Sequence, residues 1–132
     1  MKDRHGKGYS IIEVVLVVSI VAILAALAYP SYVGFARKAR RAEAQEVLMN
    51  WANRQLVWRA DHAGYNTADF NPTATDFFTF SMVADTTSYT LPATAVGDQA
   101  NDKQGTDSCA TLTLDQNNVR GVQNDCWHQA GS

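Results

Sequence analysis

The stretch that decides the fold is Ile11–Ala28, IIEVVLVVSIVAILAALA. Apart from Glu13 and Ser19 it is apolar, and as a helix it would span about 27 Å, enough to cross the hydrocarbon core of a membrane. A charged group in a segment of this length is costly to bury and usually serves a function. Glu13, near the start of the run, is therefore the residue that an interpretation of this chain must explain.

Charge is distributed unevenly along the 132 residues, which are enough for one domain besides the apolar segment. The overall net charge of −2 and mean hydropathy of −0.21 hide a segment of net charge +4 between Arg37 and Arg59. From Asp61 onward, nine aspartates face only Lys103 and Arg120, so that part has a net charge of −7. Such a part repels phosphates unless its few basic residues converge with the basic segment. We therefore do not expect nucleic acid as a partner.

Three interpretations of the apolar run start from the basic flank Met1–Gly8, which places the N-terminus in the cytoplasm. The first is a secretory signal peptide cut after Ala28, where the residues fit an A-x-A pattern. The second is an uncleaved anchor helix. Neither gives Glu13 a purpose. In the third, a cut between Gly8 and Tyr9 leaves the run on the mature protein and creates a new α-amino group at Tyr9.

The third interpretation makes Glu13 part of an ion pair. Glu13 lies four residues after the new terminus, close to the positive end of the helix dipole, which stabilises a carboxylate. It can also meet the ammonium group of Tyr9, in its own copy or a neighbouring one. Because a low dielectric makes an unpaired charge costly, we expect Glu13 to bring subunits together in register.

The segment KGYSIIEVVLVVSIVAILAALAYPSY, Lys7–Tyr32, resembles the class III signal of type IV pilins. A short basic leader ends in Gly8, an aromatic residue follows, Glu13 is the fifth residue after the cut, and Pro30 lies near the end of the apolar helix. The resemblance implies that a prepilin peptidase removes the leader and N-methylates Tyr9. It also implies that Glu13 and Pro30 act in assembly.

The rest of the chain, in RRAEAQEVLMNWANRQ and CATLTLDQ…CW, resembles the PilE-type minor pilins of type IVa systems. This implies the α+β type IV pilin fold, a long N-terminal helix packed on a small antiparallel β-sheet with a C-terminal disulfide loop. The function implied is that of a structural minor pilin in pilus assembly, serving motility, adhesion or DNA uptake. The alternatives are a major pilin, a DNA- or surface-binding minor pilin, and a pseudopilin of type II secretion.

The partners implied by the resemblance are other pilin subunits, the prepilin peptidase and an inner-membrane assembly platform. The chain would be a single-pass inner-membrane protein with a cytoplasmic N-terminus, and would lie in the pilus at the cell surface after assembly. No cofactor is expected. The sequence offers no catalytic grouping, since His5 leaves with the leader and His62 and His128 are isolated, so we do not expect an enzyme.

The helix is expected to continue well beyond the apolar run, because good helix formers resume after Pro30. We expect one helix from about Tyr9 to about Asp61, bent or locally unwound near Pro30–Gly34. Its second half carries mostly apolar residues at helical spacing: Ala44, Val47, Leu48, Trp51 and then Gln55 or Leu56. The expected divisions are a leader (1–8), a transmembrane and filament-core half (9–33) and a head (34–132), made of an amphipathic helix half (34–61), a loop (62–76) and a sheet with the disulfide region (77–132).

The basic cluster Arg37–Arg41, RKARR, has three explanations. It could bind nucleic acid or lipid head groups. It could be a solvated helix face with Glu43 and Glu46 as helix-spaced partners. In the third explanation, basic stems meet the acidic heads of neighbouring copies. The sequence leaves these alternatives open.

The head is expected to contain a hairpin, since apolar and polar residues alternate in 77–84 and in 88–96. Pro92 should place the second of these strands at an edge or a bulge. Residues 97–107, GDQANDKQGTD, are expected to form a polar loop. Two further strands are expected at CATLTLD and NNVRGV.

The two cysteines, Cys109 and Cys126, are expected to form one disulfide if the chain is exported. Closing a loop of this size would stabilise the fold by about 3 kcal/mol. A zinc site at Cys126 and His128 lacks further ligands. Oxygen ligands for calcium occur, but not with the spacing of an EF-hand loop: Asp98, Asn101, Asp102 and Asp107. No metal site is therefore predicted.

Overall fold

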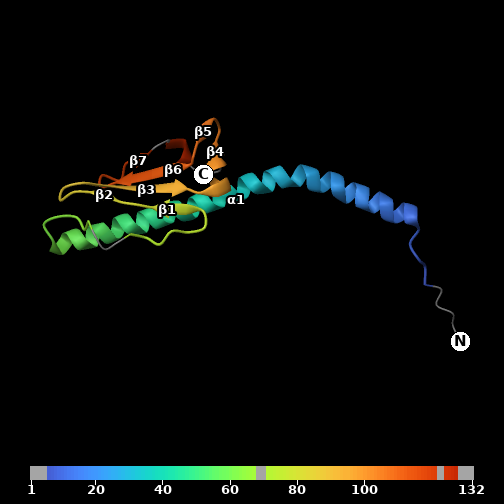
Figure 1. Ribbon diagram of the computed structural model, residues 1–132, viewed down its shortest axis with the longest axis horizontal. Coiled ribbons are helices and arrows are strands. Elements are labelled where there is room, and N and C mark those ends of the chain that lie inside the picture. The colour runs from blue at the N-terminus through green and yellow to red at the C-terminus, as the bar shows by residue number, and fades with distance from the viewer. Residues whose placement is uncertain (1–5, 68–70, 122–123, 128–132) are drawn as a thin grey trace. The chain divides into compact units, whose positions relative to one another are not determined.

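A computed structural model describes residues 6–67, 71–121 and 124–127 (Figure 1). The chain divides into two compact units, Met1–Phe35 and Ala36–Ser132. One helix, α1 (Ile11–Asp61), contributes to both. The long helix predicted from the sequence is thus confirmed.

Helix α1 begins at Ile11 because Ser10 caps it. The backbone N–H of Glu13 donates to Ser10 Oγ at 3.2 Å, and the N–H of Val14 donates to the Ser10 carbonyl at the same distance. Serine is favoured at this position because its oxygen accepts from an amide that has no partner in the first turn. The helix therefore starts two residues later than the predicted start near Tyr9.

The backbone remains helical through Pro30 and Gly34, so the local unwinding considered for this segment is not found. Proline removes one hydrogen bond from the helix, and glycine costs about 1 kcal/mol relative to alanine. A helix of 51 residues keeps the bonds on both sides of these positions. An 18-residue stretch of the helix has a mean hydropathy of 3.0 and no buried residues, and by length and composition the helix could cross a membrane.

In the second unit, one face of α1 is buried against the sheet (Figure 1). Its buried residues recur every three or four positions: Arg41, Ala44, Gln45, Leu48, Trp51 and Gln55. This confirms the predicted amphipathic half, although Leu56 is exposed. Three of the buried residues are polar, and of these the helical pattern indicated only Gln55.

The sheet is antiparallel and five-stranded. Its order is β1 (Phe78–Phe80), β3 (Tyr89–Ala95), β6 (Thr111–Asp115) and β7 (Arg120–Gly121), and β2 (Val83–Ala84) also pairs with β3. The predicted hairpin and the two later strands are confirmed. The inward side chains of β3 and β6 pack against Leu48 and Trp51 of α1, forming the hydrophobic core.

The prediction for Pro92 is wrong, because β3 is a central strand with β1 and β2 on one side and β6 on the other. The N–H of Ser81 donates to the Pro92 carbonyl at 3.1 Å, but Pro92 has no N–H to return the bond. Strands β1 and β2 stop on either side of this pair while keeping one register with β3, so there is no bulge. The proline is tolerated because its missing donor interrupts the ladder on one side only.

Residues 97–107 are not the polar loop that was predicted. They form the 3₁₀ helix η1 (Gly97–Asn101) and most of a small hairpin, β4 (Lys103–Gln104) with β5 (Asp107–Ser108). Gln99 and Asp102 are buried. Composition did not predict this structure because the buried side chains of the segment are polar. Their partners lie on α1, far away in the sequence.

The disulfide between Cys109 and Cys126 is present, with an S–S distance of 2.03 Å, as predicted. Cys109 precedes β6, and Cys126 lies in a second 3₁₀ helix, η2 (Asn124–Trp127). Because both sulfur atoms are in this bond, Cys126 cannot supply the thiolate of a zinc site. His128 lies outside the described residues.

Candidate assembly site and the head clasp

The predicted processing residues lie directly before α1. Gly8 and Tyr9 are exposed and not helical, and Glu13 follows in the first helical turn. The side chain of Glu13 borders a shallow groove of about 260 Å³ with Tyr9, Val14, Val17 and Val18. The carboxylate thus shares one surface with the residue that would carry the new amino group.

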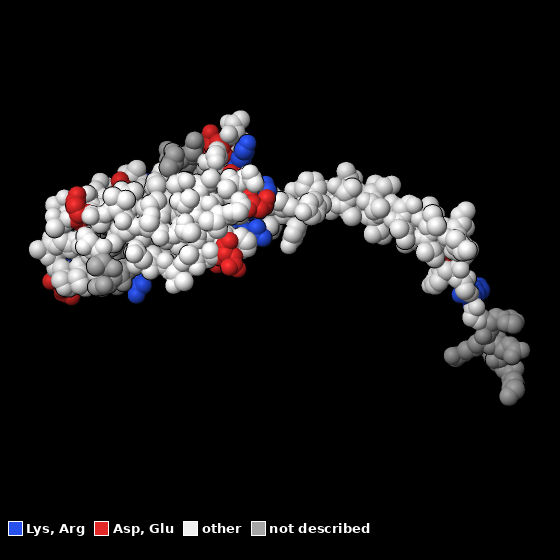
Figure 2. Space-filling model, viewed as in Figure 1, with Lys and Arg blue, Asp and Glu red and all other residues white. Residues whose placement is uncertain are grey.

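The apolar half of α1 is exposed along its length within its unit. In Figure 2 this half is almost entirely white, whereas acidic and basic side chains gather on the second unit. Pro30 lies within the helix and is exposed. Such an extended apolar surface is not stable in water, and it indicates contact with lipid or with other protein.

The basic cluster meets the acidic part of its own chain. Arg37 donates to both carboxylate oxygens of Asp98, at 3.0 and 2.7 Å. Arg41 Nη1 lies 3.0 Å from Asp102 Oδ2, and both side chains are almost completely buried, 3% and 4% exposed. Arg40 stacks on the ring of Phe77 at 3.9 Å. Arg37 and Arg41 therefore pair with aspartates of the head in their own chain.

The alternative in which Glu43 and Glu46 partner the basic cluster is not found among the ion pairs of the described residues. Both glutamates are exposed, and among the described residues neither forms an ion pair. Arg41 lies on the buried face of α1, so its guanidinium turns toward the head. Burial makes Asp102 the stronger partner, since a buried charge needs a close counter-charge.

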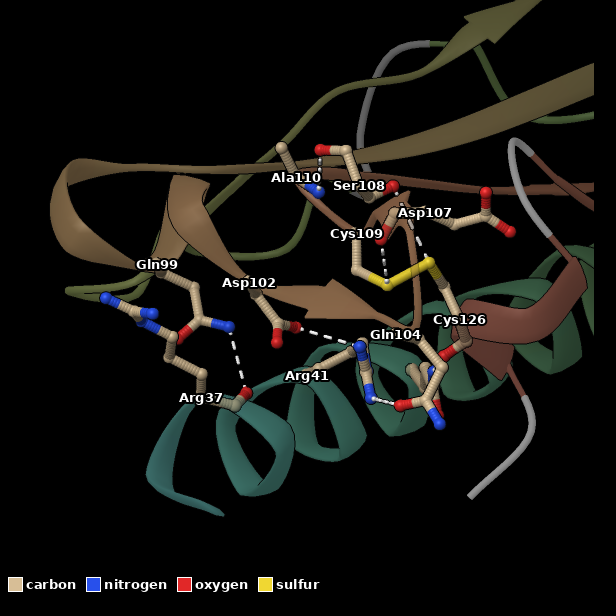
Figure 3. A network of polar contacts seen from close by, with 11 residues as sticks. Arg37, Arg41, Gln99, Asp102, Gln104, Asp107, Ser108, Cys109, Ala110 and Cys126 are labelled. Carbon is tan, nitrogen blue, oxygen red and sulfur yellow. Dashed lines mark hydrogen bonds and ion pairs between the residues drawn. A yellow bond between two sulfur atoms is a disulfide. The ribbon is translucent and has the colours of Figure 1, made fainter. Parts of the chain in front are cut away.

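Three residues of α1 hold the C-terminal part of the head, and we call their contacts the head clasp (Figure 3). The carbonyl of Arg37 accepts from Gln99 Nε2 at 2.9 Å. Arg41 pairs with Asp102 and also donates to Gln104 Oε1 at 2.9 Å. Gln45 Nε2 donates to the Cys126 carbonyl at 2.7 Å. Since Arg37, Arg41 and Gln45 are four residues apart, they form one stripe along the helix.

The pKa values of the two aspartates in this region are shifted in opposite directions. Burial raises the pKa of Asp102, and Arg41 only partly offsets this. Hydrogen bonds from Arg37 lower the pKa of exposed Asp98. Both carboxylates are thus paired with arginines, which leaves them poorly placed as the calcium ligands considered above. Among the described residues, no group of three His, Cys, Asp or Glu side chains is placed to hold a metal ion.

A second polar contact holds the far end of α1. Gln55 Nε2 donates to the Asn66 carbonyl at 2.9 Å, and Gln55 Oε1 accepts from the Asn66 N–H at 3.0 Å. Arg59 donates to the carbonyls of Ala63 and Thr86. The sequence signal that could have revealed these contacts is a glutamine at a position where helical spacing requires a buried residue.

The remaining candidates are distributed over the head. His62 stacks on Trp58 with ring centroids 3.7 Å apart, so it is not isolated as predicted. His5 lies outside the described residues. Arg120 lies over the ring of Trp127 at 5.5 Å, and Lys103 is exposed on β4.

These features together define a class of protein. A long N-terminal helix has an exposed apolar half, and its other half packs on an antiparallel sheet closed by a disulfide, which is the architecture of a type IV pilin. The family model described as "Type IV minor pilin ComP, DNA uptake sequence receptor" matches residues 30–113. The chain therefore belongs to the type IV minor pilin family, which confirms the resemblance found in the sequence. A prokaryotic N-terminal methylation motif matches residues 3–29.

Among solved structures, the chain is similar to a type IV pilin from Shewanella oneidensis. The two are 26% identical, with a TM-score of 0.59 over 70% of this chain and 99% of the other. No curated protein matches the chain. The methylation motif and the apolar half of α1 fit anchoring in the inner membrane followed by display on the pilus.

Proposed function

We propose that this minor pilin is a structural subunit of a type IV pilus, processed between Gly8 and Tyr9 and assembled through the apolar half of α1. The observation that carries the proposal is this exposed half, which contains one carboxylate, Glu13. It must be covered by lipid before assembly and by neighbouring helices afterwards, because apolar surface of this extent is unfavourable in water. The proposal includes no catalytic activity.

Processing by a prepilin peptidase is supported by the backbone around the cut. Gly8 and Tyr9 lie in exposed, non-helical chain, and the Ser10 cap keeps the helix from starting before Ile11. The new amino group at Tyr9 is the one that would be N-methylated, in keeping with the motif that covers this segment. The mature chain would then begin one residue before its helix cap.

Glu13 acts in assembly by pairing with the amino group of Tyr9, in the same subunit or a neighbour. Both residues border one groove among valines, where the dielectric falls once other helices cover it. An unpaired charge there is unfavourable, so subunits are favoured in the register that pairs the charges. The inner-membrane assembly platform would receive the processed chain, and Pro30 would adjust the helix within the filament.

The first test is mass spectrometry of the mature N-terminus from cells that make pili. We expect a chain that starts with N-methylated Tyr9. A mature chain that starts at Tyr29, after a cut behind Ala28, would disprove the proposal.

The second test compares Glu13→Gln with Glu46→Gln, a matched change at an exposed glutamate of the head half of α1. We expect Glu13→Gln to be inserted and processed but to enter filaments about tenfold less, because the amino group loses its partner. Glu46→Gln should assemble normally. Equal incorporation of the two variants would refute the role of Glu13.

A second candidate function, contact with DNA, is favoured by the description of the matching family, which names a DNA uptake sequence receptor. Charge opposes it, because Arg37 and Arg41 are paired with aspartates and the chain from Asp61 onward is acidic. A gel-shift assay with the full chain in detergent micelles tests whether the chain binds DNA. We expect no shift, whereas an affinity that falls steeply with added salt would establish the DNA function.

A further inference from the structure

The disulfide is enclosed and is attached to the head clasp at both ends. Cys109 is 0% and Cys126 is 1% exposed. The N–H of Cys109 donates to the Asp102 carbonyl at 2.9 Å, and Asp102 is the buried partner of Arg41. The carbonyl of Cys126 accepts from buried Gln45. Cys126 is therefore bonded directly to Gln45 of the clasp, and Cys109 is bonded to Asp102, the partner of Arg41. Figure 3 shows the disulfide close to Arg41 and Asp102.

The clasp and the disulfide depend on each other through this arrangement. The bond between Cys109 and Cys126 fixes the segment that carries Asp102 relative to the segment that carries the Cys126 carbonyl. Arg41 and Gln45, one helical turn apart, bind these two segments separately. The Arg41 contact thus holds one of these segments on α1, and the Gln45 contact holds the other.

We propose that the head clasp controls the reduction of the disulfide. A thiol reductant reaches the sulfur atoms only when the Arg41 and Gln45 contacts open. The intact disulfide in turn holds the buried ion pair closed. In the reaction a dithiol supplies two electrons and two protons, Cys109 and Cys126 become thiols, and the dithiol becomes a disulfide.

The sheet is not part of this mechanism. Strands β1, β3 and β6 are held by their own backbone pairing, and none of the paired residues is a cysteine. Reduction is therefore expected to release residues 97–108 and 124–127 from α1 while the sheet stays formed. Arg37 and Arg41 would then be exposed, and the basic segment would lose its neutralisation by the head.

The experiment measures the rate at which dithiothreitol reduces the disulfide of the full chain in detergent micelles, with the thiols trapped by alkylation and counted by mass spectrometry. The test variant is Gln45→Met, which removes the bond to the Cys126 carbonyl while keeping an unbranched side chain of similar length. The matched control is Gln55→Met, another buried glutamine on the same helix face, whose partner is Asn66 rather than the disulfide region.

We expect Gln45→Met to be reduced about tenfold faster than the unmodified chain, in line with the loss of one buried hydrogen bond. Gln55→Met should react within about twofold of it. An equal acceleration in both variants would mean that reduction follows global unfolding, and no acceleration in either would mean that the clasp does not guard the bond. Both results overturn the proposal.

A measurement on the unmodified chain keeps the test valid if a variant fails to fold. Local opening exposes little surface, so the rate of reduction should change only slightly when a low concentration of urea is added. A rate that rises as steeply as that of global unfolding would contradict control by the clasp. Hydrogen exchange of the reduced chain should show loss of protection at Asp102 and Cys109 and retained protection at Leu112 and Leu114.

Discussion

Single polar side chains decide where the head attaches to the helix. Arg41, Gln45 and Gln55 occupy buried positions of α1 that would usually be apolar. Each binds a partner in a later segment of the chain. A buried polar group without a partner costs more than the bond it would form, so these residues specify one docking position. Arg41 and Gln45 were missed in the sequence because a polar residue on a helix normally indicates an exposed face, whereas Gln55 was included in the helical pattern as an alternative to Leu56.

Asp85 shows the same principle in a turn between strands. Its carboxylate accepts from the backbone N–H groups of Thr87 and Ser88, both at 2.7 Å, and from the two side-chain hydroxyls. These bonds lower the pKa of Asp85 from 3.8 to about 2. Because they form only in the folded chain, Asp85 stabilises the turn that joins β2 to β3.

The first prediction concerns Asp85→Asn. A group whose pKa is depressed on folding adds stability that is complete above its unfolded pKa of 3.8 and is lost as the pH falls through about 2. The loss of unfolding free energy in Asp85→Asn should therefore be largest near pH 7 and shrink between about pH 4 and pH 2. Chemical denaturation of the full chain in micelles at several pH values measures it.

The control for this prediction is Asp76→Asn. Asp76 is exposed, and its carboxylate has no hydrogen bond or ion pair among the described residues. Its substitution should change stability little at any pH. A pH dependence of Asp85→Asn that matches that of the control would show that the turn bonds do not stabilise the fold.

At the scale of elements, helix α1 combines two environments in one regular structure. Its first half is apolar on all sides, and its second half is amphipathic. Composition and spacing predicted this change, because a helix apolar all round must be enclosed while a one-sided helix covers a core. The sequence also predicted the alternation of β3, but not the place of β3 within the sheet, since strand order depends on contacts between distant segments.

The second prediction follows from Pro92 in the central strand. In Pro92→Val the new N–H faces the carbonyl of Ser81 and can return the bond that proline leaves unmade. We expect β1 and β2 to join into one strand and stability to rise by up to about 1 kcal/mol. Hydrogen exchange of the backbone amide that this substitution introduces reports the bond. Fast exchange of this amide would show that the break between β1 and β2 has another cause.

At the scale of the whole second unit, the ion pair between Arg41 and Asp102 joins residues far apart in the sequence. The same is true of Arg37 and Asp98. Two pairs of opposite charges from the basic and acidic segments thus meet within one chain. They neutralise each other at the seam between α1 and the C-terminal part of the head.

The third prediction is that removing one partner of the buried pair is worse than removing both. Arg41→Met leaves Asp102 buried without a cation and should lower the unfolding free energy by about 3 to 5 kcal/mol at pH 7. The double variant Arg41→Met, Asp102→Leu should recover most of this loss, because no charge remains buried. Denaturation of both variants, followed by tryptophan fluorescence, measures the difference.

The pH dependence of the single variant has a definite sign. Burial raises the pKa of Asp102, so the folded chain binds a proton more readily than the unfolded chain. The contribution of Asp102 to the unfolding free energy therefore falls as the pH rises above about 4. It falls more steeply when Arg41 is absent. Arg41→Met should be less destabilised at pH 4 than at pH 7. A loss that does not change with pH would mean that Asp102 reaches solvent in this variant.

The sequence by itself determined the features that depend on local composition and spacing. The membrane-length run with Glu13, the long helix and the alternating strands all follow from neighbouring residues, and the disulfide follows from the presence of only two cysteines in an exported chain. Helical and strand periodicity, and the cost of a charge among apolar residues, act over short stretches of chain.

Only the tertiary structure decided which polar residues are buried and with whom they pair. The basic cluster could have faced lipid, solvent or another subunit, and the fold turned Arg37 and Arg41 toward Asp98 and Asp102. It also placed Pro92 in the centre of the sheet and buried part of a segment whose composition predicts a loop. The physical reason is that a buried charge or amide is stable only beside its partner, and the partner's place is set by the packing of distant segments.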